Sequence, residues 1–154
     1  MLRRAGLQAL RALLELAQEP SRWRSVNEIA AAQQLPAAML EQLLLQLRRA
    51  DLVEARRGRL GGYRLRQAPA AIPVARVLEA VGASIDLRAD LGGAGGAEPG
   101  AEATAAEQRV LGGMARRLQG ALDRELASLT LEELLFDLSS WQESLGNAGG
   151  VMLG

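Results

Sequence analysis

Residues 36–66 decide the fold, and they read PAAMLEQLLLQLRRADLVEARRGRLGGYRLR. The first half of this stretch carries leucines at the i, i+3, i+4 and i+7 spacing that lines one face of an α-helix. These leucines are Leu40, Leu43, Leu44 and Leu47. In the second half, apolar and polar residues alternate on both sides of a glycine-rich turn, which is the pattern of two half-buried strands. We therefore expect a helix with a buried leucine face, followed at once by a β-hairpin.

The outward surfaces of this expected helix and hairpin are rich in arginine. Residues 48–66 contain seven arginines and only two acidic residues. Arginine makes bidentate contacts to phosphate and guanine, and glycines at the hairpin tip permit close approach to another backbone. Taken singly, Arg64 and Arg66 fit solvated surface charges, and a frayed terminus explains Arg3 and Arg4 equally well. The residues that we expect to contact DNA are Arg3, Arg4, Ser25, Ala38, Glu41, Gln42, Arg48, Arg49, Arg56, Arg57, Gly58 and Arg59.

The residues before this stretch predict two further helices. The first runs from about residue 4 to 18 and ends before Pro20. Its expected buried stripe is Leu7, Leu10, Leu13, Leu14 and Ala17. Ser25 to Glu28 fits a capping box, in which each side chain bonds the other residue's amide, and predicts a helix from residue 26 to about 33. A short turn follows, and Pro36 is expected at the first position of the next helix. Two such helices and a hairpin are typical of a winged helix-turn-helix domain.

The rest of the chain divides into a connecting segment and two more helices. A helix from Pro73 to Gly82 is expected to close the winged domain, which would span residues 1–83. A short strand is expected at residues 84–87. The glycine- and alanine-rich run that continues to residue 104 is expected to be a flexible loop. Helices are expected within residues 105–146, and residues 147–154 are expected to form a disordered tail. The predicted fold class is therefore mainly α with a small β-hairpin wing.

The two C-terminal helices carry apolar faces that little remaining protein could cover. The stripe on the first of them is Leu111, Met114, Leu118, Leu122 and Leu126. Burial against the same helix of a second copy would give a twofold homodimer with two recognition helices. The alternative is that the long helix folds back over its own winged domain.

The composition of the chain excludes several classes of function. The 154 residues include no Cys and no His, so thiol or histidine catalysis, zinc fingers and thiolate-ligated clusters are excluded. We therefore expect no enzyme, no metal site and no cofactor. The net charge is zero, but residues 1–66 carry +6 and residues 67–154 carry −6, which indicates different partners for the two halves. No apolar run approaches the length of a membrane span, and we expect a cytoplasmic protein.

Residues 25–81 resemble the Rrf-type family of bacterial regulators, which includes iron–sulfur cluster, nitric-oxide-sensing and cysteine-metabolism repressors. The resemblance lies in the segments LEQLLLQLRRADLV and RRGRLGGYRL. It implies a homodimeric transcription factor with recognition residues on the third helix and the wing. Glu41 and Gln42 in the LEQ motif, and Arg57 and Gly58 in the RG motif, match positions that contact bases or backbone in the family.

The same resemblance shows a departure at the family's cluster ligands. Members that bind an iron–sulfur cluster place three cysteines and a further ligand before the long helix. The matching positions in this sequence are near Asp90, Ala97, Ala103 and Ala106. Either the chain is a member without a cluster, or its cysteines have been replaced by design. In both cases we expect no thiolate-ligated cluster.

These patterns predict a sequence-specific regulator of transcription that binds double-stranded DNA as a homodimer. Repression at a partly palindromic operator is the expected mode of action. The alternative is a winged-helix module that binds protein through its leucine stripes and leaves the arginines as solvated surface.

Overall fold

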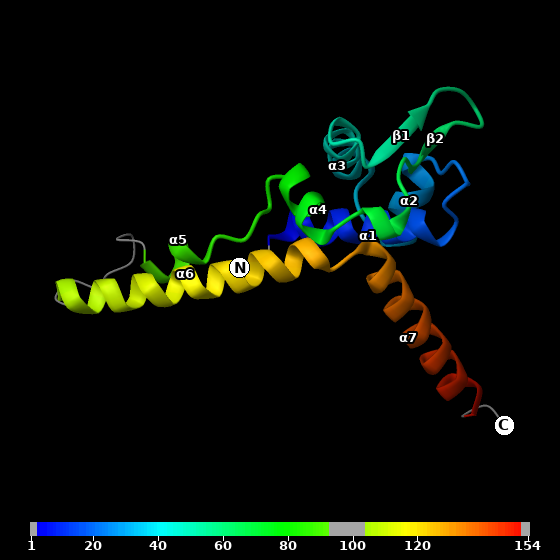
Figure 1. Ribbon diagram of the computed structural model, residues 1–154. Helices are drawn as coiled ribbons and strands as arrows, with labels where there is room; N and C mark the ends of the chain where they lie inside the picture. Colours follow the sequence, from blue (N-terminus) through cyan, green and yellow to red (C-terminus); the bar gives the residue numbers. More distant parts are fainter. Residues whose placement is uncertain (1–2, 93–103, 152–154) are drawn as a thin grey trace.

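The computed structural model of the chain describes residues 3–92 and 104–151 (Figure 1). The described ranges contain helices and one two-stranded antiparallel sheet, which projects as a hairpin beside α3, and this confirms the predicted fold class (Figure 1). The elements up to residue 83 are α1 (Arg4–Gln18), α2 (Val26–Gln33), α3 (Ala37–Arg49), β1 (Val53–Arg56), β2 (Gly62–Leu65), the 3-10 helix η1 (Pro69–Ala71) and α4 (Val74–Ala80). They are followed by α5 (Leu87–Gly92), α6 (Ala105–Ser128) and α7 (Leu131–Val151).

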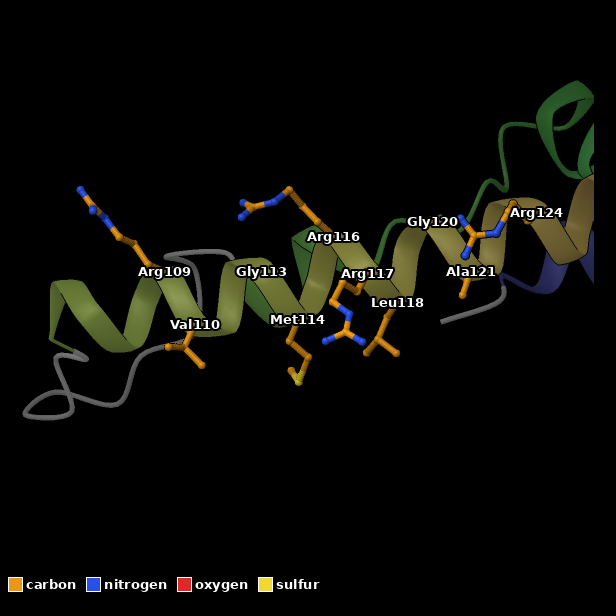
Figure 2. Close-up of a pocket in the computed structure, with 10 residues that line it drawn as sticks. All are labelled: Arg109, Val110, Gly113, Met114, Arg116, Arg117, Leu118, Gly120, Ala121 and Arg124. Carbon is orange, nitrogen blue, oxygen red and sulfur yellow. The ribbon is translucent and has the colours of Figure 1, made fainter.

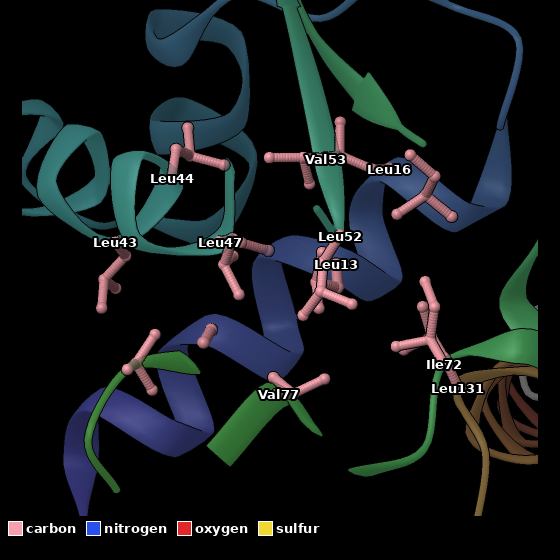
Figure 3. Close-up of a cluster of buried hydrophobic side chains, with 14 of the residues drawn as sticks. Leu13, Leu16, Leu43, Leu44, Leu47, Leu52, Val53, Ile72, Val77 and Leu131 are labelled. Carbon is pink, nitrogen blue, oxygen red and sulfur yellow. The ribbon is translucent and has the colours of Figure 1, made fainter. Parts of the chain in front are cut away.

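The leucine face of α3 is buried as its spacing predicts. Figure 3 shows Leu43, Leu44 and Leu47 directed toward side chains from α1 and from β1. Full burial of a leucine side chain contributes about 1.5–3 kcal/mol, so this face is a major part of the stability of the winged domain. All four predicted leucines of α3 are at most 5% exposed.

The buried face of α1 differs from the predicted one. Leu7 is 49% exposed, whereas Ala9 and Ala12 are fully buried. The reason is that α1 contacts α2, α3, α4, α7 and β2, so several of its sides are covered. Small alanine side chains allow these neighbours to approach closely, and a leucine stripe alone does not reveal such a position. The buried apolar residues of α1 are Ala9, Ala12, Leu13, Leu16 and Ala17.

The hairpin pairs Val53 with Leu65 and Ala55 with Tyr63. A third segment joins it, because the amide and carbonyl of Arg24 bond the carbonyl and amide of Tyr63 at 2.8 and 2.7 Å. Gly62 permits this junction, since its φ is +140° and a Cβ there would lie 2.2 Å from the Arg24 carbonyl oxygen. The base of the wing is thereby held to the segment that precedes α2.

Two details at helix starts correct the predictions. The Ser25 hydroxyl accepts the Glu28 amide at 3.1 Å as expected, but the Glu28 carboxylate pairs with Arg24 and Arg22 instead of the Ser25 amide. The nearby guanidinium groups are stronger partners for a carboxylate than a neutral amide is. Pro36 is the residue before α3 and not its first helical residue, because its ψ is extended at 130°.

The segment after α4 also differs from expectation. No strand forms at residues 84–87, and α5 begins at Leu87, within the range that was expected to be irregular. The buried Gln119 side chain accepts the Leu87 amide at 2.7 Å and donates to the Ile85 carbonyl at 2.9 Å. These bonds satisfy the backbone that a strand partner would otherwise satisfy. Residues 93–103 of the expected loop lie outside the described residues.

The C-terminal helices leave the winged domain in two directions (Figure 1). Thr104 caps α6 with Glu107, and the predicted start near residue 105 is correct. Thr130 and Glu133 form a capping box at the start of α7, in which each side chain accepts the other residue's amide. Leu131 in that first turn is fully buried in the core of the winged domain. Residues 147–151 continue α7, contrary to the expected disordered tail, and the last residues of that tail lie outside the described ranges.

Candidate DNA-binding surface

The outer face of α3 is exposed and opposite to its leucine face. Ala38, Glu41 and Gln42 lie there, and Arg48 and Arg49 extend the face to the end of the helix. Figure 1 shows α3 and the hairpin on the side of the molecule opposite to α6 and α7. Five of the predicted residues therefore share one accessible helix face next to the wing.

The arginines of the hairpin fall into two groups. Arg64 pairs with Glu54, and Arg66 pairs with Asp51 at 2.9 Å, so both are engaged within the chain. In the part of the chain that the structure describes, neither Arg57 nor Arg59 has an ion pair or a side-chain hydrogen bond. Gly58 between them has φ +107°, a left-handed conformation that favours glycine. The wing tip therefore presents two uncompensated positive charges.

Arg56 has a structural role that the sequence did not reveal. Its guanidinium donates to the Leu60 carbonyl at 2.6 Å and lies 4.6 Å from the centre of the Trp23 ring. The Arg64 guanidinium lies 4.3 Å from the same ring. A cation over an indole ring is stabilised by about 0.5–2 kcal/mol. Trp23 was not among the predicted functional residues, and no local motif marks it.

The N-terminal arginines and Ser25 lie outside α3. Arg3 precedes α1 and donates to the Gly82 carbonyl at 3.4 Å, beyond the end of α4. Arg4 is exposed in the first turn of α1. Ser25 caps α2, and its hydroxyl is used there. Ser25 also lies beside the wing, because a Cβ at Gly62 would be 2.8 Å from its amide nitrogen.

A second exposed surface lies on α6, and we call it the α6 face. Figure 2 shows Val110, Met114 and Leu118 projecting from one side of this helix. Leu111, Met114 and Leu118 are 41–46% exposed, whereas Leu126 packs against the core of its own chain. The predicted dimerisation stripe is thus divided between an open part and a covered part. Four arginines of α6 have no ion pair within the described residues: Arg109, Arg116, Arg117 and Arg124. Figure 2 shows Arg117 on the same side as the apolar residues of the α6 face, and Arg109 and Arg116 on the other side of the helix.

The comparison with protein families decides the identity of the chain. The family model described as Rrf2, iron-dependent transcriptional regulator, matches residues 2–137. The chain belongs to the Rrf2 family. A protein of Synechocystis sp. named as an HTH-type transcriptional regulator is 37% identical over 139 residues, covering 90% of this chain and 89% of that protein. The regulator IscR of Cereibacter sphaeroides is 35% identical and covers 71% of this chain and 72% of its own. These relatives are named as regulators of transcription, not as enzymes.

Solved Rrf2-type structures share the fold. CymR of B. subtilis, the global cysteine regulator of that organism, is 28% identical and superposes with a TM-score of 0.66 over 88% of this chain and 95% of its own. IscR of T. potens is 25% identical, with a TM-score of 0.65 over 92% and 90% of the two chains. This Rrf2 chain is therefore a DNA-binding regulator of transcription.

The side chains of this Rrf2 protein do not fit a thiolate-ligated cluster. The chain has no Cys or His, and its described residues contain no group of three or more potential metal-ligating side chains. Asp90 lies in α5 and Ala106 in the first turn of α6, while Ala97 and Ala103 lie outside the described ranges. Among the described residues, no helix combines the length and the apolar character needed to cross a membrane.

Proposed function

We propose that this Rrf2 protein is a homodimeric repressor that places the α3 of each subunit in successive major grooves of a partly palindromic operator. The grooves would be about 34–36 Å apart. The observation that carries the proposal is the exposed polar face of α3 beside a wing tip with two unpaired arginines. The protein would act in the bacterial cytoplasm, where its operator lies.

Each exposed side chain has a chemical role in this arrangement. Glu41 accepts a hydrogen bond from the cytosine N4 amino group, and Gln42 forms a bidentate pair with adenine. Arg57 enters the adjacent minor groove or binds phosphate, which positions the subunit without reading sequence in the major groove. Base preference should therefore depend on α3, and general affinity on the wing.

The α6 face supports the homodimer. Leu111, Met114 and Leu118 expose apolar surface that burial against a second copy would remove from water. The arginines of α6 also lack partners in the described residues, whereas α7 carries four acidic residues and no basic ones. A second copy thus offers both apolar surface and acidic charge. The described part of the chain covers this face with neither.

The proposal is tested by selecting bound duplexes from a random pool and measuring affinity for the selected and a scrambled duplex. Arg57→Ala should weaken binding to both duplexes by about tenfold, because one phosphate or minor-groove contact is lost. Glu41→Ala should reduce the preference for the selected duplex by about 1–3 kcal/mol while scrambled binding stays unchanged. Arg66→Ala, which removes an already paired arginine of the same hairpin, is the matched control and should have a smaller effect than Arg57→Ala.

Salt dependence separates DNA binding from a protein-binding role. With several phosphate contacts, affinity should fall by roughly a thousandfold or more between about 50 and 200 mM salt. Affinity independent of salt, or equal affinity for selected and scrambled duplexes, would contradict the proposal.

A further inference from the structure

The tip of the wing is a tight turn that exposes an apolar side chain. The Gly61 amide donates to the Gly58 carbonyl at 3.1 Å, so Arg59 and Leu60 occupy the two central positions of the turn. The Leu60 side chain is 83% exposed, the largest value for any large hydrophobic side chain in the described residues. Apart from Leu7, the other exposed large hydrophobics lie on α6 and α7. Leu60 is therefore an isolated apolar group that directly follows the free Arg59, three residues after the free Arg57.

The backbone of this turn is held from inside the hairpin. Arg56 donates to the Leu60 carbonyl at 2.6 Å, which ties the carbonyl to β1 while the side chain remains in solvent. A Cβ at Gly61 would lie 2.1 Å from the Arg56 carbonyl oxygen, so the two strands approach as closely as the backbone allows. The direction of Leu60 is thus set by Arg56.

Arg56 is itself positioned by Trp23. Arg24 forms an antiparallel bridge with Tyr63 on the edge of β2 that faces away from β1. In this antiparallel register, Trp23 lies across from Arg64. Both Arg56 and Arg64 lie over the indole ring, at 4.6 and 4.3 Å. Arg64 is also paired with Glu54, which limits its freedom to move away. The ring therefore links the segment before α2 to the turn that carries Leu60.

We infer that Leu60 is an apolar contact to the minor groove of the duplex, and that Trp23 is a positioning residue that acts on it through Arg56. The inference rests on the proposed DNA binding. The minor groove of a G·C pair contains the guanine N2 amino group, which an A·T pair lacks. A leucine cannot hydrogen-bond that amino group and would desolvate it, so Leu60 favours A·T pairs flanking each half-site.

Inosine provides the test, because an inosine·C pair lacks the N2 amino group but keeps the major-groove face of G·C. Three versions of the selected duplex would carry A·T, G·C or inosine·C pairs where the wing reaches the flank. The wild-type protein should bind the inosine duplex as tightly as the A·T duplex. Its affinity for both should be at least about fivefold higher than its affinity for the G·C duplex. Equal affinity for the inosine and G·C duplexes would overturn the inference while leaving the proposed function intact. Absence of duplex binding altogether would instead refute the proposed function and, with it, this inference.

Two wing variants separate Leu60 from the neighbouring arginine. Leu60→Asn keeps the size of the side chain and both arginines, and should bring the inosine and G·C affinities to within about twofold. Arg57→Ala should weaken all three duplexes while the ratio between them persists. A Leu60→Asn variant that keeps the wild-type ratio would assign the preference to another group and overturn the role of Leu60.

Trp23 is tested by substitution and rescue. Trp23→Leu should reduce the inosine preference as Leu60→Asn does, whereas Trp23→Phe, which keeps an aromatic face, should retain most of it. Arg56→Gln should resemble Trp23→Leu, since both remove the contact between the Arg56 guanidinium and the indole ring. Thermal unfolding would verify that each variant is folded. In a Trp141→Phe background, Trp23 is the only tryptophan, and Arg56→Gln should alter its fluorescence. A preference that survives both Trp23→Leu and Arg56→Gln would overturn the positioning role.

Discussion

The winged domain and the two C-terminal helices differ in what covers their side chains. In the winged domain, the leucine face of α3 and the valine and leucine side chains of α4 are buried within the chain, and several arginines have acidic partners. On α6 and α7, Met114, Phe136 and Trp141 are 41–72% exposed. The arginines of α6 lack acidic partners in the described residues. The core side chains of the winged domain are covered by their own chain, whereas those of α6 and α7 leave apolar and charged surface uncovered within the described residues.

The two regions differ in burial because their elements differ in length and in the number of neighbouring elements. The winged domain folds several short elements around α1, so each apolar face finds a neighbour nearby. The helices α6 and α7 are 24 and 21 residues long and are joined by only two residues, yet they diverge from each other. Each can cover the other only near their junction. This contrast predicts that mutations will affect stability in one region and association in the other.

The largest effect is expected from a deletion in the winged core. Leu47→Ala should lower the free energy of unfolding by about 3 kcal/mol, because a fully buried leucine is replaced by a cavity. Phe136→Ala, which truncates a 72% exposed ring on α7, should cost less than about 0.5 kcal/mol. Denaturant unfolding at one fixed protein concentration measures both. If both variants lose the same free energy of unfolding, Phe136 is buried in solution. The difference in burial between the winged domain and α7 would then not hold.

A charge on the α6 face should act on association instead. Leu118→Glu should raise the dimer dissociation constant by about tenfold or more, since it places a carboxylate in the proposed apolar contact. Leu60→Glu introduces the same charge at a more exposed leucine outside α6, and should leave the dimer intact. Sedimentation velocity over a range of concentrations distinguishes the two. A wild-type protein that remains monomeric throughout would remove the basis for the α6 interface.

The same contrast explains which features could be predicted from the sequence. The leucine face of α3 and the strand alternation are local repeats, so their burial followed from spacing alone. Trp23 owes its role to Arg56 and Arg64, which reach it only after the hairpin has folded back onto Arg24. Periodicity reports the distance between residues along a helix or strand. Periodicity carries no information about contacts between residues that are distant in the sequence and meet only in the folded chain.

Gln119 is a second example of this limit. Its position in α6 fits an apolar helix pattern poorly and suggests an exposed side chain, but it is only 8% exposed. Its partners, Ile85 and Leu87, precede it by more than thirty residues. The strand expected at residues 84–87 was wrong for the same reason, because a side chain and not a strand satisfies that backbone. The exposed outer face of α3 was easier to predict, since it is defined by the buried face opposite to it. That its residues contact DNA stays a prediction.

A smaller effect is expected from the partly buried ion pairs of the winged domain. Arg24 binds Glu15 at 3.1 Å, and the two side chains are only 11% and 18% exposed. Arg24→Leu should lower the free energy of unfolding by about 1–3 kcal/mol, because the Glu15 carboxylate loses its cation in a shielded site. Arg66→Leu breaks the exposed pair with Asp51 and should cost about 0–1 kcal/mol. If the two variants lose the same stability, pairing alone, and not burial, sets the contribution of these arginines.

The smallest effect is expected at Glu19. A hydrogen bond from Arg22, and then its positive charge, lower the pKa of the Glu19 carboxyl below its ordinary value. A lowered pKa in the folded state stabilises the protein at pH above the ordinary pKa, and this contribution is lost as the pH falls through the folded-state value. Both side chains are more than half exposed, so solvent and salt screen the pair. Glu19→Gln should therefore leave the unfolding midpoint at neutral pH unchanged within error.

A carbon-detected titration of Glu19 should nevertheless report the lowered pKa, and added salt should move it back toward the ordinary value. A midpoint that falls in Glu19→Gln as far as in Arg24→Leu would show that an exposed partner stabilises as much as a shielded one. In that case, the lack of ion-pair partners for the arginines of α6 would lower the stability of the single chain. If Glu19→Gln has no effect, the two regions differ through burial, and the exposed unpaired arginines of α6 cost the single chain little stability.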